Sequence, residues 1–460
     1  MNGSSRHGEE NKAAEPSVRR FSAWLAAFNS GDRERYATFL ADSFPARLAL
    51  LDQEMAFREW TGGFDLRKLE RVSATEACGL VQERASDQFA RFELTVAATG
   101  PHVIASLDMA AIPRPAEFAI ARLTQGQAIA GIQAALSQDA AGDRFSGAVL
   151  VARDGQVLFS RAYGLADRER GIPNTLQTRF RIGSMNKMFT AVAILQLVEA
   201  GQVELTAPLG AYLTRYPNRD VATQVTIHHL LTHTGGTGDI FGPEFEAHRQ
   251  ELRTHGDYVQ LYGDRGLQFE PGSRWQYSNY GFILLGAVIE KVTGQTYYDY
   301  VKAHIYQPAK MTATGSQPED QEVPDRSVGY TRPPGTTEPV PNTGTLPYRG
   351  TSAGGGYSTA GDLARFARAL LGHQLLRPGS TQLLITAKGE PAAGARYAYG
   401  FDDGRDAEGN GSVGHGGGAP GMNGDLRICP KSGYIVVVLA NMDPPAAHRI
   451  AGWLDARLPT

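Results

Sequence analysis

The first apolar side chains at helical spacing are Val18, Phe21, Trp24, Leu25 and Phe28. Residues three and four apart share one face of a helix, so this stripe predicts an amphipathic helix. Gly31 and Asp32 end it and start a second helix with Tyr36, Phe39 and Leu40 on one face. Residues 1–15 are polar and are expected to be disordered.

The period of the pattern then changes to two. Apolar and polar residues alternate over 92–98 and again over 103–109, and Gly100-Pro101 turns the chain between these runs. This pattern predicts a pair of strands, and residues of roughly 69 to 84 are expected to supply a further strand. Two helices followed by an antiparallel sheet indicate a small α+β domain over residues 16–120.

A second domain is expected over residues 123–460. Two β-rich runs, 145–152 and 157–159, are joined by Asp154-Gly155, which is a strong hairpin signal. A long apolar helix follows Ser184, and two strands flank the turn at 430–433 before a terminal helix near 446–458. The last strands can pair with the hairpin at 146–159. One antiparallel sheet would then be built from both ends of the domain, with a helical region inserted between them.

Two segments of the inserted region are informative. Residues 226–236 have a threonine start and a glycine stop and predict a short helix. Its His229 and His233 have the i, i+4 spacing of some metal sites, but no acidic third ligand follows, so the sequence indicates neither a metal nor another cofactor. Residues 314–350 hold seven prolines and are expected to form a long ordered excursion or a mobile flap.

Composition limits the possible partners. The 45 basic and 48 acidic residues give a net charge of -3, which does not favour nucleic acid or an anionic membrane. The longest apolar runs are well short of the roughly 18 residues that a membrane span needs, so a soluble protein is expected. Cys78 and Cys429 lie in different domains and are expected to be core thiols.

Arg19-Arg20 superficially resembles a twin-arginine export signal. The apolar stretch that follows is short for a signal core, and the amphipathic helix is the preferred interpretation. The sequence as written therefore indicates a cytoplasmic protein, or a periplasmic or secreted one if a signal peptide has been removed.

The first candidate for chemistry is Ser184-Met185-Asn186-Lys187. Residues three apart in a helix lie one turn above each other, which would hold the Lys187 amine near the Ser184 hydroxyl. A serine hydroxyl is inert until a base takes its proton, and a lysine can serve only if burial or other cations lower its pKa. Taken alone, a capped helix without a catalytic role is the simpler interpretation of this motif.

Two further elements change that balance: Tyr277-Ser278-Asn279 on a loop before an apolar helix, and His415-Gly416-Gly417 on a late strand. Their order and spacing resemble the serine β-lactamases and penicillin-binding proteins. The likeness is greatest to the class C β-lactamase-like group, which includes family VIII carboxylesterases and D-amino-acid peptidases. It extends through residues 230–236, 271–275 and 353–359 and covers about 145–458. The resemblance implies an α+β, β-lactamase/transpeptidase-like fold.

The resemblance implies roles for four side chains. Ser184 would be the nucleophile and Lys187 its activating amine. Tyr277 would act with Lys187 as general base and then protonate the leaving group. Asn279 would hydrogen-bond Lys187 or the substrate.

The same resemblance implies that the late strand, with His415, Gly416 and Gly417, lies along the substrate. The backbone N–H groups of Ser184 and Gly418 would form the oxyanion hole, where a helix N-terminus and a strand edge face the developing charge. β-Lactamases usually have a lysine and then a serine or threonine at this strand. Here a mostly neutral histidine and a glycine stand instead, which puts β-lactam turnover in doubt.

Two other motifs are expected to be decoys. Gly350-Thr351-Ser352-Ala353-Gly354 fits the Gly-x-Ser-x-Gly pattern of α/β-hydrolases, but its flanks are not the strand and helix that this motif needs. Gly416, Gly418 and Gly421 fit Gly-x-Gly-x-x-Gly, but Pro420 and the strand-like residues after it exclude a dinucleotide-binding helix.

We therefore expect a serine hydrolase that acts through an acyl-enzyme on a small-molecule ester, as carboxylesterases do. The alternatives are a D-amino-acid peptidase or amidase, a β-lactamase or DD-carboxypeptidase, and, in another class, a non-catalytic peptidoglycan-binding or scaffolding module. The N-terminal domain loosely resembles the nuclear-transport-factor-2-like domains, which are used for binding or pairing. It is expected to have a pairing or scaffolding role and could support a homo-oligomer.

Overall fold

The structure is a computed structural model, which describes residues 15–112, 114–333, 336, 338–389 and 396–460. The chain divides into two compact units. One consists of residues 1–121 with 333–338, and the other of residues 122–332 with 339–460. Apart from Glu15, the N-terminal segment expected to be disordered lies outside the described residues.

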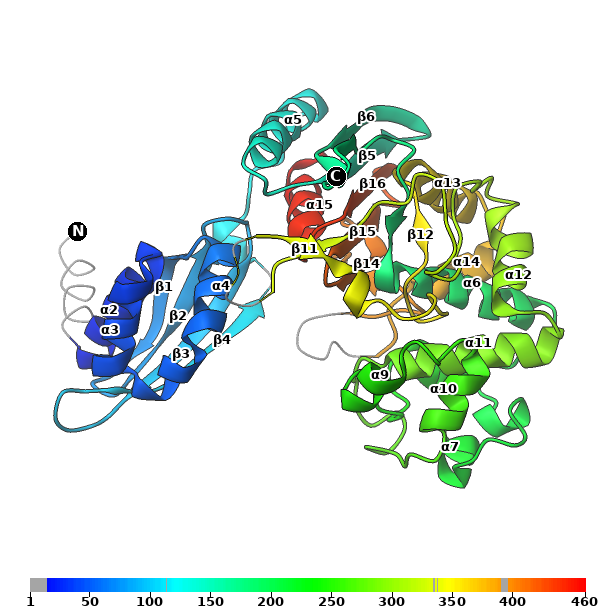
Figure 1. The fold of residues 1–460 in the computed structure, drawn as a ribbon, viewed down its shortest axis with the longest axis horizontal. Coiled ribbons are helices and arrows are strands. Elements are labelled where there is room, and N and C mark those ends of the chain that lie inside the picture. Colours follow the sequence, from blue (N-terminus) through cyan, green and yellow to red (C-terminus); the bar gives the residue numbers. More distant parts are fainter. Residues whose placement is uncertain (1–14, 113, 334–335, 337, 390–395) are drawn as a thin grey trace. The chain divides into compact units, whose positions relative to one another are not determined.

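The N-terminal unit is an antiparallel sheet in the order β1-β2-β3-β4, covered by helices (Figure 1). The strands are β1 (Phe64–Val72), β2 (Glu76–Glu83), β3 (Phe89–Val96) and β4 (Ile104–Ile112). The other elements are α2 (Pro16–Ser30), α3 (Arg33–Ser43), η1 (Pro45–Leu50), α4 (Leu51–Thr61) and η2 (Ala116–Phe118). Its core lies between α2 and the sheet, where the Phe21 and Phe92 rings stack with their centroids 3.7 Å apart.

Two elements of this unit differ from the sequence-based expectation. The segment expected to give one strand over 69–84 forms parts of two, because a turn closed by a Ser73 N–H to Glu76 O hydrogen bond separates β1 from β2. Helix α4 was not expected at all. The apolar positions of this helix form no clear stripe in the sequence, and only Thr61 is buried in the structure.

The second unit is organised around a six-stranded antiparallel sheet in the order β13-β14-β15-β16-β5-β6. These strands are β13 (Asp402–Asp403), β14 (Val413–Ala419), β15 (Met422–Ile428), β16 (Tyr434–Ala440), β5 (Gly147–Arg153) and β6 (Gln156–Tyr163). β16 pairs with β5 from Tyr434 opposite Arg153 to Ala440 opposite Gly147. The expectation of one sheet built from both ends of the domain is therefore confirmed.

Helices cover both faces of this sheet (Figure 1). On β5, Val149 and Val151 pack with α5 (Gln125–Ala141) and α15 (Ala446–Arg457), whereas Ala148 and Leu150 join the core formed with α6 (Asn186–Glu199) and α13 (Ala360–Leu371). Two buried faces explain why β5 and β16 are continuous apolar runs without alternation.

The inserted helical region lies between β9 and β12 in the sequence. It contains α7 (Arg219–Gln224), α8 (Ile227–Leu231), α9 (Pro243–His248), α10 (His255–Tyr262), α11 (Asn279–Thr293), α12 (Tyr297–Val301) and the π-helical turn η5 (Lys302–Tyr306). α14 (Pro378–Ile385) follows α13. The remaining short elements are β7 (Leu165–Asp167), β8 (Ile172–Pro173), β9 (Phe180–Arg181), η3 (Gly183–Met185), η4 (Leu209–Ala211) and β12 (Tyr357–Ser358).

The proline-rich segment 314–350 is largely irregular, and residues 334, 335 and 337 lie outside the described part. Its described residues include β10 (Tyr330–Thr331), β11 (Val340–Pro341) and η6 (Asn342–Thr345). Within the described ranges, no helix is both long and apolar enough to cross a membrane. Cys78 and Cys429 are both free and buried, as expected for core thiols.

Candidate active site

Ser184 and Lys187 lie at the start of helix α6, which packs against one face of the six-stranded sheet. Ser184 belongs to the short 3-10 turn η3, and α6 begins two residues later. Gly183 has a φ of 54°, a left-handed conformation that favours glycine, and it turns the chain into η3. Lys187 Nζ lies 3.2 Å from Ser184 Oγ. The spacing of the motif therefore gives the side-chain contact that the sequence predicts.

The Lys187 amine is completely buried and makes three polar contacts. It lies near Ser184 Oγ and donates to Asn279 Oδ1 at 2.7 Å and to the Ala353 carbonyl oxygen. The Tyr277 ring lies beside it, with Nζ 4.7 Å from the ring centroid. Burial lowers the pKa of Lys187 to about 7, although the nearby Asp239 carboxylate acts in the opposite direction.

Tyr277 lies on the loop before α11 and lines the same cavity as Ser184. Burial raises the pKa of its hydroxyl, and the hydrogen bond between Tyr277 and Ser184 opposes this shift without cancelling it. The phenol is therefore neutral over the range in which Lys187 titrates. Of these two groups, only Lys187 can be a free base near neutral pH.

Asn279 is held by a carboxylate that the sequence motifs do not include. Asp239 Oδ1 accepts the Asn279 backbone N–H at 2.9 Å, and Asp239 Oδ2 accepts the Asn279 side-chain amide at 3.1 Å. Because the amide nitrogen is used by Asp239, the amide oxygen must face Lys187. Asp239 and Asn279 are 40 residues apart, and no spacing pattern signals their contact.

The glycines of β14 allow the strand to pass close to η3. A side chain at Gly417 would place its Cβ 2.0 Å from the Ile182 carbonyl oxygen and 3.2 Å from Ser184 N. Gly418 N would lie 3.1 Å from a Cβ on Gly183. Only residues without side chains permit this approach, which brings the Gly418 backbone next to the nucleophile turn.

His415 lies on β14 and is buried, with both ring nitrogens engaged by the protein. Nε2 is 3.0 Å from the Tyr397 hydroxyl, and Nδ1 is 2.5 Å from the Gly416 carbonyl oxygen. Burial lowers the pKa of His415, and the Asp402 carboxylate partly offsets this. His415 is therefore a neutral wall of the cleft and not a cation that could hold a substrate carboxylate.

Six of the eight predicted site residues line one cavity of about 570 Å³, namely Ser184, Tyr277, His415, Gly416, Gly417 and Gly418. Lys187 and Asn279 contact each other behind Ser184. The cavity continues past Gly416 to Asp402, Asp425 and His448, none of which the sequence singled out. Within the described part of the chain, no three histidine, cysteine, aspartate or glutamate side chains are grouped to hold a metal ion.

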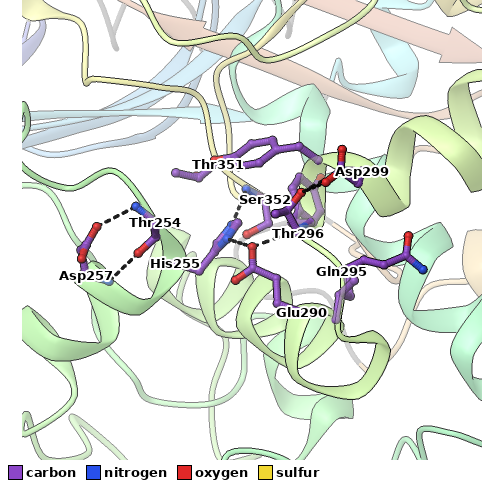
Figure 2. Close-up of polar contacts among 12 residues, drawn as sticks. Thr254, His255, Asp257, Glu290, Gln295, Thr296, Asp299, Thr351 and Ser352 are labelled. Carbon is purple, nitrogen blue, oxygen red and sulfur yellow. Dashed lines mark hydrogen bonds and ion pairs between the residues drawn. The ribbon is translucent and has the colours of Figure 1, made fainter.

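Residues 351–353 form a second support for the lysine. Their three carbonyl oxygens accept in turn from Asn186 Nδ2, Thr190 Oγ1 and Lys187 Nζ, all on α6. On the other side, the Ser352 backbone N–H donates to His255 Nε2 at 3.3 Å, and His255 Nδ1 lies 3.0 Å from Glu290 Oε1. Figure 2 shows this histidine between the glutamate on α11 and the Ser352 segment.

The arrangement of Ser352, His255 and Glu290 looks like a catalytic triad but cannot act as one. Ser352 is fully buried, its Oγ donates to the Phe282 carbonyl oxygen at 2.8 Å, and only its backbone N–H contacts the histidine. This geometry agrees with the expectation that the Gly-x-Ser-x-Gly match is a decoy. The cluster is a structural support for the loop that ends at the Ala353 carbonyl.

Comparison with known families places this geometry in context. Residues 129–458 match the family described as Beta-lactamase, which is more than half of the chain, so the protein belongs to that family of serine hydrolases. The match leaves out the N-terminal unit. Its resemblance to nuclear-transport-factor-2-like domains therefore stays a prediction.

Two relatives illustrate the range of the family. PbpX of Bacillus subtilis, provisionally named a penicillin-binding protein, is 32% identical over 64% of this chain and 70% of its own length. Esterase EstB of Burkholderia gladioli is 38% identical over 39% of this chain. The matched segment spans half of that esterase's length.

Solved structures agree on the fold. A penicillin binding protein from Bacillus halodurans is 35% identical and superposes with a TM-score of 0.63, over 69% of this chain and 99% of its own. A D-stereospecific amidohydrolase from Streptomyces is 29% identical, with a TM-score of 0.60 over 71% of this chain and 98% of its own.

Proposed function

We propose that this protein is an esterase that forms an acyl-enzyme on Ser184, with Lys187 as the general base. The observation that carries the proposal is the set of contacts around Lys187. A neutral amine has two N–H groups and one lone pair. Asn279 Oδ1 and the Ala353 carbonyl oxygen can only accept, so they take both N–H groups. The lone pair is left for the Ser184 hydroxyl, 3.2 Å away.

The acylation step follows from this orientation. Lys187 takes the proton of Ser184 Oγ as that oxygen attacks the ester carbonyl carbon. The negative charge that develops on the carbonyl oxygen is stabilised by the backbone N–H groups of Ser184 and Gly418. Tyr277 then gives its hydroxyl proton to the departing alkoxide and recovers a proton from Lys187. The products of this step are the alcohol and the acyl-Ser184 ester, with both bases restored.

Deacylation repeats the same proton path with water in place of Ser184. Lys187, through Tyr277, takes a proton from water as the water oxygen attacks the acyl carbon. Ser184 leaves as an alkoxide and is reprotonated by Lys187. The carboxylic acid product is released.

The preference for esters rests on the wall opposite the nucleophile. His415 is held neutral and its ring nitrogens are occupied, and Gly416 carries no hydroxyl. This strand therefore offers neither a cation nor a hydroxyl to hold the carboxylate of a β-lactam. The alkoxide of an ester is also a better leaving group than the nitrogen anion of an amide. A site with few specific contacts should therefore cleave esters faster than amides.

A D-amino-acid amidase is the second candidate, and one observation favours it. Asp402 lines the same cavity as Ser184 and Tyr277, and it is exposed to solvent there. A carboxylate in this place could pair with the free ammonium group of an amino-acid amide. The D-stereospecific amidohydrolase from Streptomyces supports considering this substrate class.

The test uses one preparation and three substrates: a short p-nitrophenyl ester, a D-amino-acid amide and a chromogenic cephalosporin. We expect the largest kcat/KM for the ester and little turnover of the cephalosporin. A dominant value for the amide would make the protein an amidase, and a dominant value for the cephalosporin would refute the preference derived from His415.

The nucleophile is tested separately with a fluorophosphonate probe. Wild-type protein should be labelled, Ser184→Ala should not, and Ser352→Ala is the matched serine control that should retain its labelling if the protein folds. Labelling that persists in Ser184→Ala would refute the assignment. A wild type with neither labelling nor turnover would favour a binding or scaffolding module.

A further inference from the structure

We propose that His233 is the positioning residue for Tyr277, a role that rests on the proposed function of Tyr277 in proton transfer. His233 follows α8 and lies 44 residues before Tyr277 in the sequence. It is 1% exposed, and its φ of 59° is in the left-handed region, which is uncommon for residues other than glycine. Such a conformation persists only where surrounding contacts fix it, and it often marks a functional site.

His233 contacts Tyr277 and both of its neighbours in the sequence. Its carbonyl oxygen accepts the backbone N–H of Gln276 at 2.9 Å, and its Nδ1 accepts the backbone N–H of Ser278 at 3.1 Å. These are the two residues next to Tyr277. Between them, the imidazole ring packs on the Tyr277 ring with centroids 4.3 Å apart and an angle of 35° between the planes.

This arrangement needs both the left-handed backbone and a neutral ring. The left-handed turn lets one residue direct its carbonyl group and its side chain at the same loop. A backbone N–H can only donate, so Nδ1 must carry a lone pair and the proton must lie on Nε2. Burial lowers the pKa of His233 well below its usual value, and the nearby Lys187 and His415 act in the same direction, which keeps the ring in this form.

The Nε2 atom is the remaining observation. It is buried and has no hydrogen-bond partner among the described residues. An unsatisfied buried donor costs stability, so the ring is not explained by its contribution to folding alone. A phenylalanine would fill the space without this cost but could not accept the Ser278 N–H. The histidine is retained, we infer, for the position that it gives to the Tyr277 hydroxyl.

Three other features of the molecule do not indicate a further site. The exposed apolar side chains Leu48, Phe57 and Trp60 of the N-terminal unit have nothing to identify a partner. The Asp425–His448 pair lines the cavity already described. The His255–Glu290 pair supports a backbone segment that has several other contacts, so its loss would be shared among them.

The experiment is a double-mutant cycle between His233 and Tyr277, measured as kcat and KM for a p-nitrophenyl ester. His233→Gln removes the acceptor at the δ position, whereas His233→Asn keeps an oxygen there and tolerates the left-handed backbone. We expect His233→Gln to lower kcat by about 100-fold with little change in KM, because a misplacement of about 1 Å has that effect. His233→Asn should recover at least about 10-fold of this loss.

The matched control is His229→Gln, which makes the same substitution four residues earlier. His229 occupies the third position of a capping box at the start of α8, where glutamine is also suitable, so activity should be unchanged. Thermal unfolding of every variant identifies any that fail to fold. If His233→Gln does not fold, the comparison of His233→Asn with wild type takes its place in the cycle.

The cycle distinguishes this inference from the proposed function. If His233 acts through Tyr277, His233→Gln should cost less than about 3-fold further in a Tyr277→Phe background. A full additional loss in that background, or His233→Asn no better than His233→Gln, would overturn the positioning role while leaving the function of Tyr277 intact. A Tyr277→Phe variant with wild-type kcat would instead refute the proposed function of Tyr277.

Discussion

Asp239 is expected to set the pH at which the enzyme becomes active. Its carboxylate is connected to the Lys187 amine through the side chain of Asn279, by hydrogen bonds of 3.1 Å and 2.7 Å. A negative charge there favours the protonated amine and so opposes the effect of burial on the pKa of Lys187. Asp239→Asn removes this charge, and the pKa of Lys187 should fall below about 7.

The size of the effect can be estimated from the two hydrogen bonds. They place the two charges roughly 6–8 Å apart, which at an effective dielectric constant of about 20 corresponds to about 2–3 kcal/mol, or about 1–2 pKa units. Asp239→Asn also removes the partner that orients Asn279. If the Asn279 amide turns its nitrogen toward Lys187, the protonated amine is disfavoured further. Both effects therefore have the same sign.

The assay is the pH dependence of kcat/KM, which reports the groups of the free enzyme. For Asp239→Asn, the midpoint of the acid limb should move about 1–2 pH units lower, while the maximal rate falls because Asn279 is less well oriented. Asp220→Asn is the matched control, since Asp220 is exposed on α7 of the same unit and should leave the profile unchanged. A midpoint that stays in place or moves higher would refute the electrostatic role of Asp239.

Two further predictions concern stability and the glycine strand. Lys187→Met should change the pH dependence of thermal unfolding. The Lys187 amine is protonated in the unfolded chain but, with its pKa lowered to about 7, neutral in the fold, so folding releases a proton and the contribution of this group to stability rises by about 4 kcal/mol between about pH 7 and about pH 10. The variant should lack this gain. Equal slopes of Tm against pH for the wild type and Lys187→Met would contradict this prediction. Gly417→Ala should abolish activity and lower Tm, because its Cβ would meet the Ile182 carbonyl oxygen at 2.0 Å. Gly126→Ala is its control on helix α5, where a Cβ meets no atom within 4 Å, and should be neutral or slightly stabilising.

The elements of the hydrolase unit that the sequence predicts well are those with a local cause. The contact between Ser184 and Lys187 follows from helical geometry, because residues three apart lie one turn above each other. The pairing of β16 with β5 follows from two fully apolar runs that need buried neighbours on both faces. In the N-terminal unit, by contrast, α4 and β1 carry mixed polar and apolar positions. Two register shifts break the alternation of β1, and α4 buries only Thr61, so neither element shows a clear period in the sequence.

The parts of the site that could not be predicted are tertiary contacts between polar groups without a shared motif. Asp239 orients Asn279 across 40 residues, and the Ala353 carbonyl meets Lys187 across 166 residues. A backbone carbonyl has no residue signature, and an aspartate on a glycine-rich loop is most often a solvated side chain. Only the structure shows that Asp239 orients the Asn279 amide whose oxygen accepts from Lys187, and that the Ala353 carbonyl oxygen accepts from Lys187 directly.

These acceptors explain why the Ser-x-x-Lys motif is insufficient by itself. The motif fixes the distance between the amine and the hydroxyl, but it does not fix the direction of the amine lone pair. That direction is set by Asn279 and Ala353, and each of them is held from behind, Asn279 by Asp239 and the segment of Ala353 by α6 and His255. A chain that kept the motif and lost either support would still bury its lysine beside the serine. Its amine could then turn an N–H toward Ser184 Oγ, and a donor in that place cannot accept the proton that the reaction requires.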